Sequence, residues 1–249
     1  MSMTDLSGVQ IHENERAAAR AGAEEFRQLA IDAVASAGRF SAALTGGGSP
    51  VEMYRLLATK EFADSIPWQS VHLFWGDDRC VPPAHPRSNF GMANDLFIDS
   101  VSIPAENVHR IRGELGSEEG ARQYEAELRS FFGSSPDFDL VHLGVGDDSH
   151  VASLFPFQIE NLSERERWVV PALERELGEP RVSLSMRAIN SARVVRMLLP
   201  NGERAGLVAK LLEGPLDPFR LPAQLVHPVD GRQLWLLTRD SARELTNRS

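Results

Sequence analysis

The sequence alternates between short apolar runs and amphipathic segments, and this alternation constrains the fold more than any other feature. The apolar runs have the length of strands, which we expect at residues 40–45, 71–75, 138–143, 168–170, 182–186, 194–199 and 233–237. Between them, apolar residues recur at helical spacing, which predicts helices at residues 14–35, 51–58, 89–97, 117–132 and 202–212. Strands that alternate with helices predict an α/β class: a three-layer, Rossmann-like fold whose mostly parallel sheet is covered by helices on both faces.

Length and composition fit one globular domain. The 249 residues contain no repeat, low-complexity tract or linker, so we expect a single domain over residues 1–249 with its core at about residues 14–242. The 26 basic and 35 acidic residues give a net charge of −9, which makes nucleic acid or an anionic membrane an unfavourable partner. A lone cysteine, Cys80, excludes an internal disulfide framework and a cysteine-rich zinc site.

No apolar stretch approaches the roughly 20 residues that a membrane-spanning helix needs. The N-terminal stretch also lacks the apolar core of a signal peptide. We therefore expect a cytoplasmic protein that is a monomer or a weak homo-oligomer and has no membrane partner.

The loops that follow the apolar runs are the places to look for chemistry, because ligands of open α/β sheets bind beyond the carboxyl ends of the strands. The first loop reads Thr-Gly-Gly-Gly-Ser-Pro at residues 45–50. Glycines let the backbone approach a ligand closely, and N–H groups before a helix bind phosphate. We expect Ser49 to cap that helix and Pro50 to begin it. A tight turn without a ligand is the alternative.

The second loop combines acids with an arginine. Asp77, Asp78 and Arg79 follow the run at residues 71–75, and Ser88 and Asn89 come shortly after. Arginine binds phosphate through two parallel hydrogen bonds, and an adjacent aspartate fixes its orientation. A surface ion pair of small energetic value is the alternative.

The third loop places a histidine beside acids, just past the run at residues 138–143. It reads Gly-Val-Gly-Asp-Asp-Ser-His from Gly144 to His150. A histidine near its ordinary pKa is a natural general base at neutral pH, and a nearby aspartate can set its tautomer. The same residue types bind metals, but the sequence offers no second cluster to complete a metal site.

Other features are weaker. The run Arg-Val-Ser-Leu-Ser at residues 181–185 has no assigned role, and Arg204 either adds positive charge to a phosphate site or is a solvated residue at a helix start. His72 and His142 fall within expected strands, where we expect satisfied core histidines. The remaining histidines are expected in loops or near a terminus: His12, His85, His109 and His227.

In this order and spacing, the segments together resemble those of the 6-phosphogluconolactonase family. The pieces are ALTGGGSP, FWGDDRCVP, SNFGMAN, DLVHLGVGDDSHVASLFP, RVSLSM, PAQLVHP and LWLLT, and the resemblance as a whole runs from about Ala18 to Ala242. The resemblance implies a single α/β domain that hydrolyses 6-phospho-D-glucono-1,5-lactone to 6-phospho-D-gluconate, the second step of the oxidative pentose phosphate pathway. It implies a small phosphosugar lactone as the substrate and neither a metal nor an organic cofactor.

The resemblance also implies roles for individual residues. His150 matches the catalytic base, with Asp77 and Asp148 as the accompanying acids. The residues expected to bind substrate are Gly46, Gly47, Gly48, Ser49, Arg79, Ser88, Asn89, Gly146 and Arg204. His150 would take a proton from the attacking water and then protonate the leaving ring oxygen, while N–H groups of residues 144–146 stabilise the oxyanion.

The sequence departs from the family pattern at a few positions. Ser149 stands where the family usually has glycine, Asp147 replaces a common proline, and Arg204 replaces a more frequent lysine. Gly48-Ser49 stands for the usual Ser-Thr. Two alternatives follow: a non-catalytic sugar-phosphate-binding homologue, or a glucosamine-6-phosphate deaminase on the same fold. The run at residues 152–156, Ala-Ser-Leu-Phe-Pro, disfavours the deaminase, which carries Phe-Asn-Glu-Pro.

Overall fold

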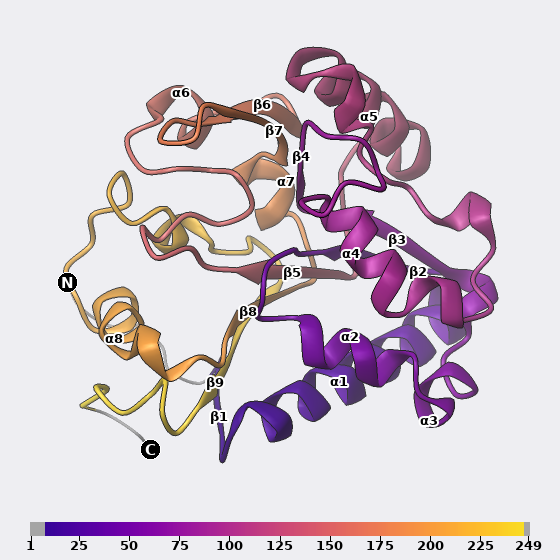
Figure 1. Cartoon of the computed structure of the whole chain (residues 1–249), viewed down its shortest axis with the longest axis horizontal. Coiled ribbons are helices and arrows are strands. Elements are labelled where there is room, and N and C mark those ends of the chain that lie inside the picture. The colour runs from indigo at the N-terminus through magenta and orange to yellow at the C-terminus, as the bar shows by residue number, and fades with distance from the viewer. Residues whose placement is uncertain (1–7, 247–249) are drawn as a thin grey trace.

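The computed structural model describes residues 8–246, and a six-stranded sheet lies at its centre (Figure 1). In spatial order its strands are β1 (Val9–His12), β9 (Arg232–Thr238), β8 (Val194–Leu199), β5 (Leu140–Gly144), β2 (Phe40–Leu44) and β3 (Val71–Trp75). Every neighbouring pair is parallel. The prediction of a mostly parallel sheet is therefore confirmed. The first seven and last three residues of the domain expected at 1–249 lie outside the described residues.

The inner strands β2, β5 and β8 are mostly apolar and almost entirely buried because both faces of the sheet are covered. Every residue of β2 and of β8 is buried. This pattern is typical of parallel sheets, whose crossover connections place helices on the two faces. The apolar runs that predicted these strands were therefore informative without any alternation of polar and apolar residues.

The helices pack on the sheet as amphipathic segments. They are α1 (Glu15–Ala37), α2 (Val51–Leu57), α3 (Lys60–Ala63), α4 (Asn89–Leu96), α5 (Ser117–Phe132), α6 (Ile159–Leu162), α7 (Met186–Asn190) and α8 (Ala205–Leu212). Short 3-10 turns occur at Trp68–Ser70, Ile98–Ser100, Ala105–Asn107, Gly113–Leu115, Gly202–Arg204 and Pro222–Leu225. In Figure 1, α1 and α2 lie together on one side of the strands and α5 lies on the other. Among residues 8–246, no helix is long and apolar enough to cross a membrane.

A second, three-stranded antiparallel sheet stands beside the main one. Its order is β4 (Asp77–Arg79), β7 (Glu179–Leu184) and β6 (Val169–Glu174). Strand β4 was not predicted, because we expected its three charged residues to form a loop. The small sheet is joined directly to the main one, since the Leu184 N–H donates to the Gly76 carbonyl at 2.7 Å.

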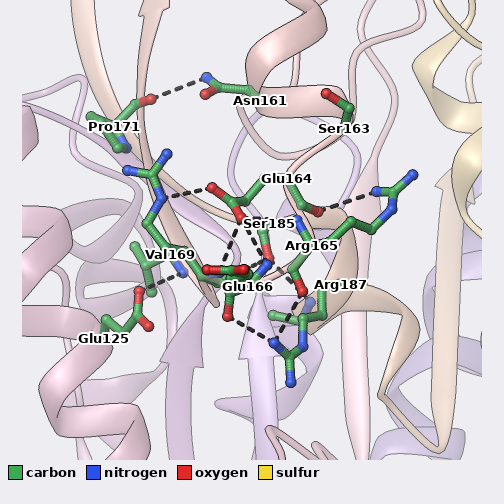
Figure 2. A network of polar contacts seen from close by, with 12 residues as sticks. Glu125, Asn161, Ser163, Glu164, Arg165, Glu166, Val169, Pro171, Ser185 and Arg187 are labelled. Atoms are coloured by element: carbon green, nitrogen blue, oxygen red, sulfur yellow. Dashed lines mark hydrogen bonds and ion pairs between the residues drawn. The ribbon is translucent and has the colours of Figure 1, made fainter.

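A polar network anchors the turn that leads into β6 (Figure 2). The Glu164 carboxylate accepts hydrogen bonds from the backbone N–H groups of residues 165–167, and these bonds, with the Arg167 side chain, lower the pKa of Glu164 to about 2. The Arg187 guanidinium donates to two carbonyls of the same turn, at 3.0 and 2.8 Å. The Ser185 hydroxyl donates to a third at 2.7 Å. The turn is thus fixed from α7, so the small sheet has a rigid support.

The strand histidines differ from each other. His72 Nδ1 lies 3.1 Å from His109 Nε2, so its prediction as a satisfied residue is confirmed. His142 is fully buried, and neither ring nitrogen has a hydrogen-bond partner among the described residues, so the same prediction is wrong for this residue. Burial, with a smaller contribution from Arg196, lowers the pKa of His142 to about 3, so the imidazole is neutral in the fold.

Candidate active site

A cavity of about 240 Å³ opens at the carboxyl ends of four neighbouring strands. The segments after β2, β3, β5 and β8 all reach it, as expected for a parallel sheet. Its lining comprises Thr45, Gly46, Gly47, Gly48, Ser49, Asp77, Arg79, Asn89, Gly144, Val145, Gly146, Asp147, His150, Ala152, Arg181 and Arg204. The three loops that the sequence singled out therefore meet in one place.

The glycine loop forms one wall and is held by its neighbours. A side chain at position 46 would place its Cβ 1.9 Å from the amide oxygen of Asn89, so only glycine fits there. The Thr45 hydroxyl accepts a hydrogen bond from the Gly144 N–H at 3.1 Å, which ties the first loop to the third. The predicted cap is wrong: α2 begins at Val51, as the helix expected at residues 51–58 does, but Pro50 and not Ser49 takes the N-cap position and no side chain caps the helix.

Asp77 and Asp78 have different environments because they are adjacent on β4, where successive side chains point to opposite faces. Asp77 lines the cavity; its carboxylate accepts hydrogen bonds from the Ser153 hydroxyl at 2.6 Å and from the Asn89 amide at 3.2 Å. Asp78 lies outside the cavity lining and accepts backbone N–H groups at the start of α4. Burial raises the pKa of Asp78 despite these bonds. Asp77 is thus the carboxylate that faces the cavity, whereas Asp78 holds the start of α4.

His150 and Asp148 form a close pair in the turn after β5. Asp148 Oδ1 lies 2.6 Å from His150 Nδ1 and accepts the His150 N–H at 3.1 Å. Burial acts to raise the pKa of Asp148, but the hydrogen bonds from His150 outweigh this effect and hold the pKa below its usual value. Asp148 engages Nδ1, so Nε2 is the ring nitrogen left for a ligand. This is the arrangement that fixes a tautomer for general-base chemistry.

The turn that carries the pair is tight. Ser149, between the two residues, has a φ of 74°, which is in the left-handed region, and its hydroxyl is buried without a partner among the described residues. At Gly146, an added Cβ would lie 2.1 Å from His150 Nδ1. The Gly146 N–H donates to the His150 carbonyl and the Gly144 N–H to Thr45, so neither is free for the oxyanion role expected of them.

Three arginines give the cavity its positive charge, each held differently. Arg79 donates to the Arg87 carbonyl, and its Nε is buried without a partner among the described residues. Arg181 is mostly buried, 2.7 Å from Glu179 and 3.9 Å from Asp77. Desolvation on burial lowers the pKa of Arg181. Arg204 Nε lies 3.1 Å from Asp147. Such a cluster suits an anionic ligand.

The structure brings together ten of the twelve residues expected at the site. Asp148 lies outside the lining, at the edge of the His150 ring, and Ser88 caps α4 and donates to Asp78 instead of reaching the cavity. Arg181 and Ser153 were not expected at the site. Arg181 belongs to the run at residues 181–185, but only the pairing of β7 with β4 brings it to the cavity. Among residues 8–246, no three His, Cys, Asp or Glu side chains gather closely enough to hold a metal ion.

Comparison with known families decides the relationship of the chain. Residues 13–235 match the family described as glucosamine-6-phosphate isomerases/6-phosphogluconolactonase. The chain belongs to this family. The resemblance stated from the motifs alone is therefore confirmed, and the cavity residues of the three loops all fall within the matched region.

Individual members of the glucosamine-6-phosphate isomerase/6-phosphogluconolactonase family are similar over most of their length. A 6-phosphogluconolactonase from Nostoc sp. is 36% identical over 219 residues, covering 86% of this chain and 88% of the relative. The crystal structure of a protein described as devB is 30% identical with a TM-score of 0.89, covering 96% and 99% of the two chains. A 6-phosphogluconolactonase structure from Thermotoga maritima is 27% identical with a TM-score of 0.78, covering 92% and 98%.

Proposed function

We propose that the protein hydrolyses 6-phospho-D-glucono-1,5-lactone to 6-phospho-D-gluconate in the oxidative pentose phosphate pathway. The observation that carries this proposal is the His150–Asp148 pair at a cavity that also holds the glycine loop and three arginines. A base and an anion-binding wall in one cavity suit an ester that carries a phosphate away from the reacting carbon. The similarity to 6-phosphogluconolactonases supports the same substrate.

His150 acts as the general base in this proposal. Nε2 takes a proton from water as the water oxygen attacks C1 of the lactone. The bond from C1 to the ring oxygen then breaks, and the imidazolium returns the proton to that oxygen. Asp148 keeps the Nδ1 proton in place and stabilises the transient positive charge, so it acts through His150 as a positioning residue.

The remaining residues bind and orient the substrate. Gly46, Gly47, Gly48 and Ser49, with Arg79 and Arg204, hold the phosphate. Arg181 and His150 both lie close to Phe155: the guanidinium carbon is 5.8 Å and the His150 ring 4.8 Å from the Phe155 ring centre.

Binding the remote phosphate fixes the lactone carbonyl near His150, so little entropy is lost at the chemical step.

We further propose that residues 1–249 work as one Rossmann-like domain of three layers. The continuous hydrophobic core that runs through both sheets supports this.

The test is hydrolysis of freshly made 6-phosphogluconolactone, coupled to 6-phosphogluconate dehydrogenase and corrected for the spontaneous rate. His150→Ala should lower kcat by roughly 10²–10⁴-fold, the usual contribution of a general base. His227→Ala, at an exposed histidine, is the matched control and should behave as wild type. Glucono-1,5-lactone, which lacks the phosphate, should be a poor substrate.

Each other outcome has a definite meaning. Wild-type turnover in folded His150→Ala would remove His150 from the base role. No acceleration by the folded wild-type protein would favour the non-catalytic sugar-phosphate binder, and release of ammonia from glucosamine 6-phosphate would favour the deaminase.

A further inference from the structure

Two oppositely charged residues are in contact with each other at the cavity. Asp147, in the turn after β5, pairs with Arg204, just before α8, at 3.1 Å from Nε to Oδ1. Both residues line the cavity together with Gly48 and Ser49 of the glycine loop. The pair therefore sits where the proposed function requires the phosphate to bind.

The two partners are held unequally. The Asp147 side chain is 88% exposed, whereas that of Arg204 is 27% exposed. Arg204 also donates from Nη1 to the Val145 carbonyl. The guanidinium is thus fixed by the backbone without help from Asp147, and the carboxylate is free to swing into water. An incoming anion can therefore displace Asp147 from Arg204, because the ion pair that is lost is weak and screened by solvent.

The other two arginines of the cavity differ in this respect. Arg181 is paired with Glu179 and Asp77, whose carboxylates are themselves buried and cannot move away from it. Arg79 donates a hydrogen bond to the Arg87 carbonyl, which carries no net charge. Within the described cavity lining, Asp147 is the exposed carboxylate that neutralises a phosphate-binding cation.

We propose that Asp147 is a specificity-determining residue that weakens the binding of phosphate by occupying Arg204 and by adding negative charge at the rim of the cavity. This inference rests on the proposed function. A phosphate carries close to two negative charges at pH 7, so repulsion by Asp147 acts on it much more than on an uncharged sugar ring. Asp147 thereby reduces the preference of the site for phosphorylated over unphosphorylated lactones, and it eases release of the phosphorylated product.

The test compares Asp147→Asn with wild type in two measurements. The first is the KM and kcat for 6-phosphogluconolactone and for glucono-1,5-lactone. The second is the Kd of 6-phosphogluconate and of inorganic phosphate by calorimetry, which needs no turnover. We expect KM and Kd to fall about three- to tenfold for the phosphorylated ligands, and KM for glucono-1,5-lactone to stay the same.

Two further variants show whether the effect acts through Arg204. Asp230→Asn makes the same charge change at an exposed residue just before β9, at the opposite end of the strands from the cavity, and should change nothing. In an Arg204→Gln background, Asp147→Asn should have a much smaller effect on Kd than in the wild-type background.

Each outcome bears on one hypothesis. An unchanged or increased Kd in Asp147→Asn would overturn the inference, and an increase would mean that the carboxylate positions Arg204 for phosphate. An equal fall in Kd for Asp230→Asn would mean that the effect comes only from the net charge of the protein, and this result would also overturn the inference. If no lactone is hydrolysed by the wild type but the Kd values respond as expected, the proposed function fails and the role of Asp147 stands.

Discussion

Replacing Ser149 with glycine is expected to stabilise the protein. A non-glycine residue in the left-handed region, here at a φ of 74°, costs about 1–2 kcal/mol. The buried hydroxyl, which has no partner within residues 8–246, costs about 1–3 kcal/mol more. Glycine loses about 0.4–1 kcal/mol through the freedom of the unfolded chain, and the lost methylene removes about 0.8 kcal/mol of packing. The net gain is about 2 kcal/mol, or a rise in Tm of about 4–8 °C for a chain of this size.

Thermal unfolding followed by circular dichroism measures this gain, and two variants separate its sources. Ser149→Ala removes the hydroxyl and keeps the left-handed backbone, so it should recover only the part due to the hydroxyl. Ala152→Gly relieves the second positive φ of the same segment, 50°, where no hydroxyl is involved. It should therefore report the relief of backbone strain, offset by the same losses of packing and of unfolded-chain restriction that apply to Ser149→Gly.

The reasoning would be refuted in either of two ways. If Ser149→Ala and Ser149→Gly both lower the Tm, the hydroxyl makes a stabilising bond in solution. If Ser149→Gly is less stable than Ser149→Ala by the whole of the glycine losses, about 1–2 kcal/mol from the freer unfolded chain and the lost methylene, the left-handed backbone carries no strain.

Two other predictions concern histidines. Because the pKa of His142 is about 3 in the fold and near 6.5 in the unfolded chain, the unfolded state gains a proton first as the pH falls, so stability is lost from about pH 6.5 downward. At pH 5 the loss is about 2 kcal/mol, and urea unfolding of His142→Leu should lack it, whereas exposed His227→Gln should keep it. Gly146→Ala should lower kcat at least a hundredfold, because the new methyl group would lie on His150 Nδ1, while Gly48→Ala, with nothing within 4 Å of its Cβ, should keep most of the activity. A Gly146→Ala enzyme with full activity would mean that the turn relaxes without separating His150 from Asp148.

Most strands of the main sheet could be predicted because they are largely apolar runs covered on both faces, as in β2 and β8. The edge strand β1, which is partly exposed and has no apolar run, was not among the predicted strands. The site could be predicted for a related reason: its loops follow those strands directly, so finding the runs also located the loops. His150 and Asp148 are two residues apart, and a local turn is enough to pair them.

The small sheet could not be predicted in the same way. Asp77–Arg79 has no strand pattern, and β4 exists only because β7 pairs with it from about a hundred residues away. The different surroundings of Asp77 and Asp78 follow from that pairing, since only a strand turns adjacent side chains to opposite faces. Arg181 reaches the cavity through the same pairing, and Ser153 reaches Asp77 through a contact between distant segments. These features depend on tertiary contacts, which local sequence patterns do not predict.

Because β1 lies against β9, with Val9 aligned to Trp235, the first described strand can take its place in the sheet only after β9 has been synthesised. Until then β1 has no neighbour, and β8 has an open edge of six buried residues. Parallel pairing between such distant segments is slow, and open apolar edges invite association between chains. A chain truncated before Arg232 would therefore lack β9, leave the edge of β8 uncovered and be prone to aggregate.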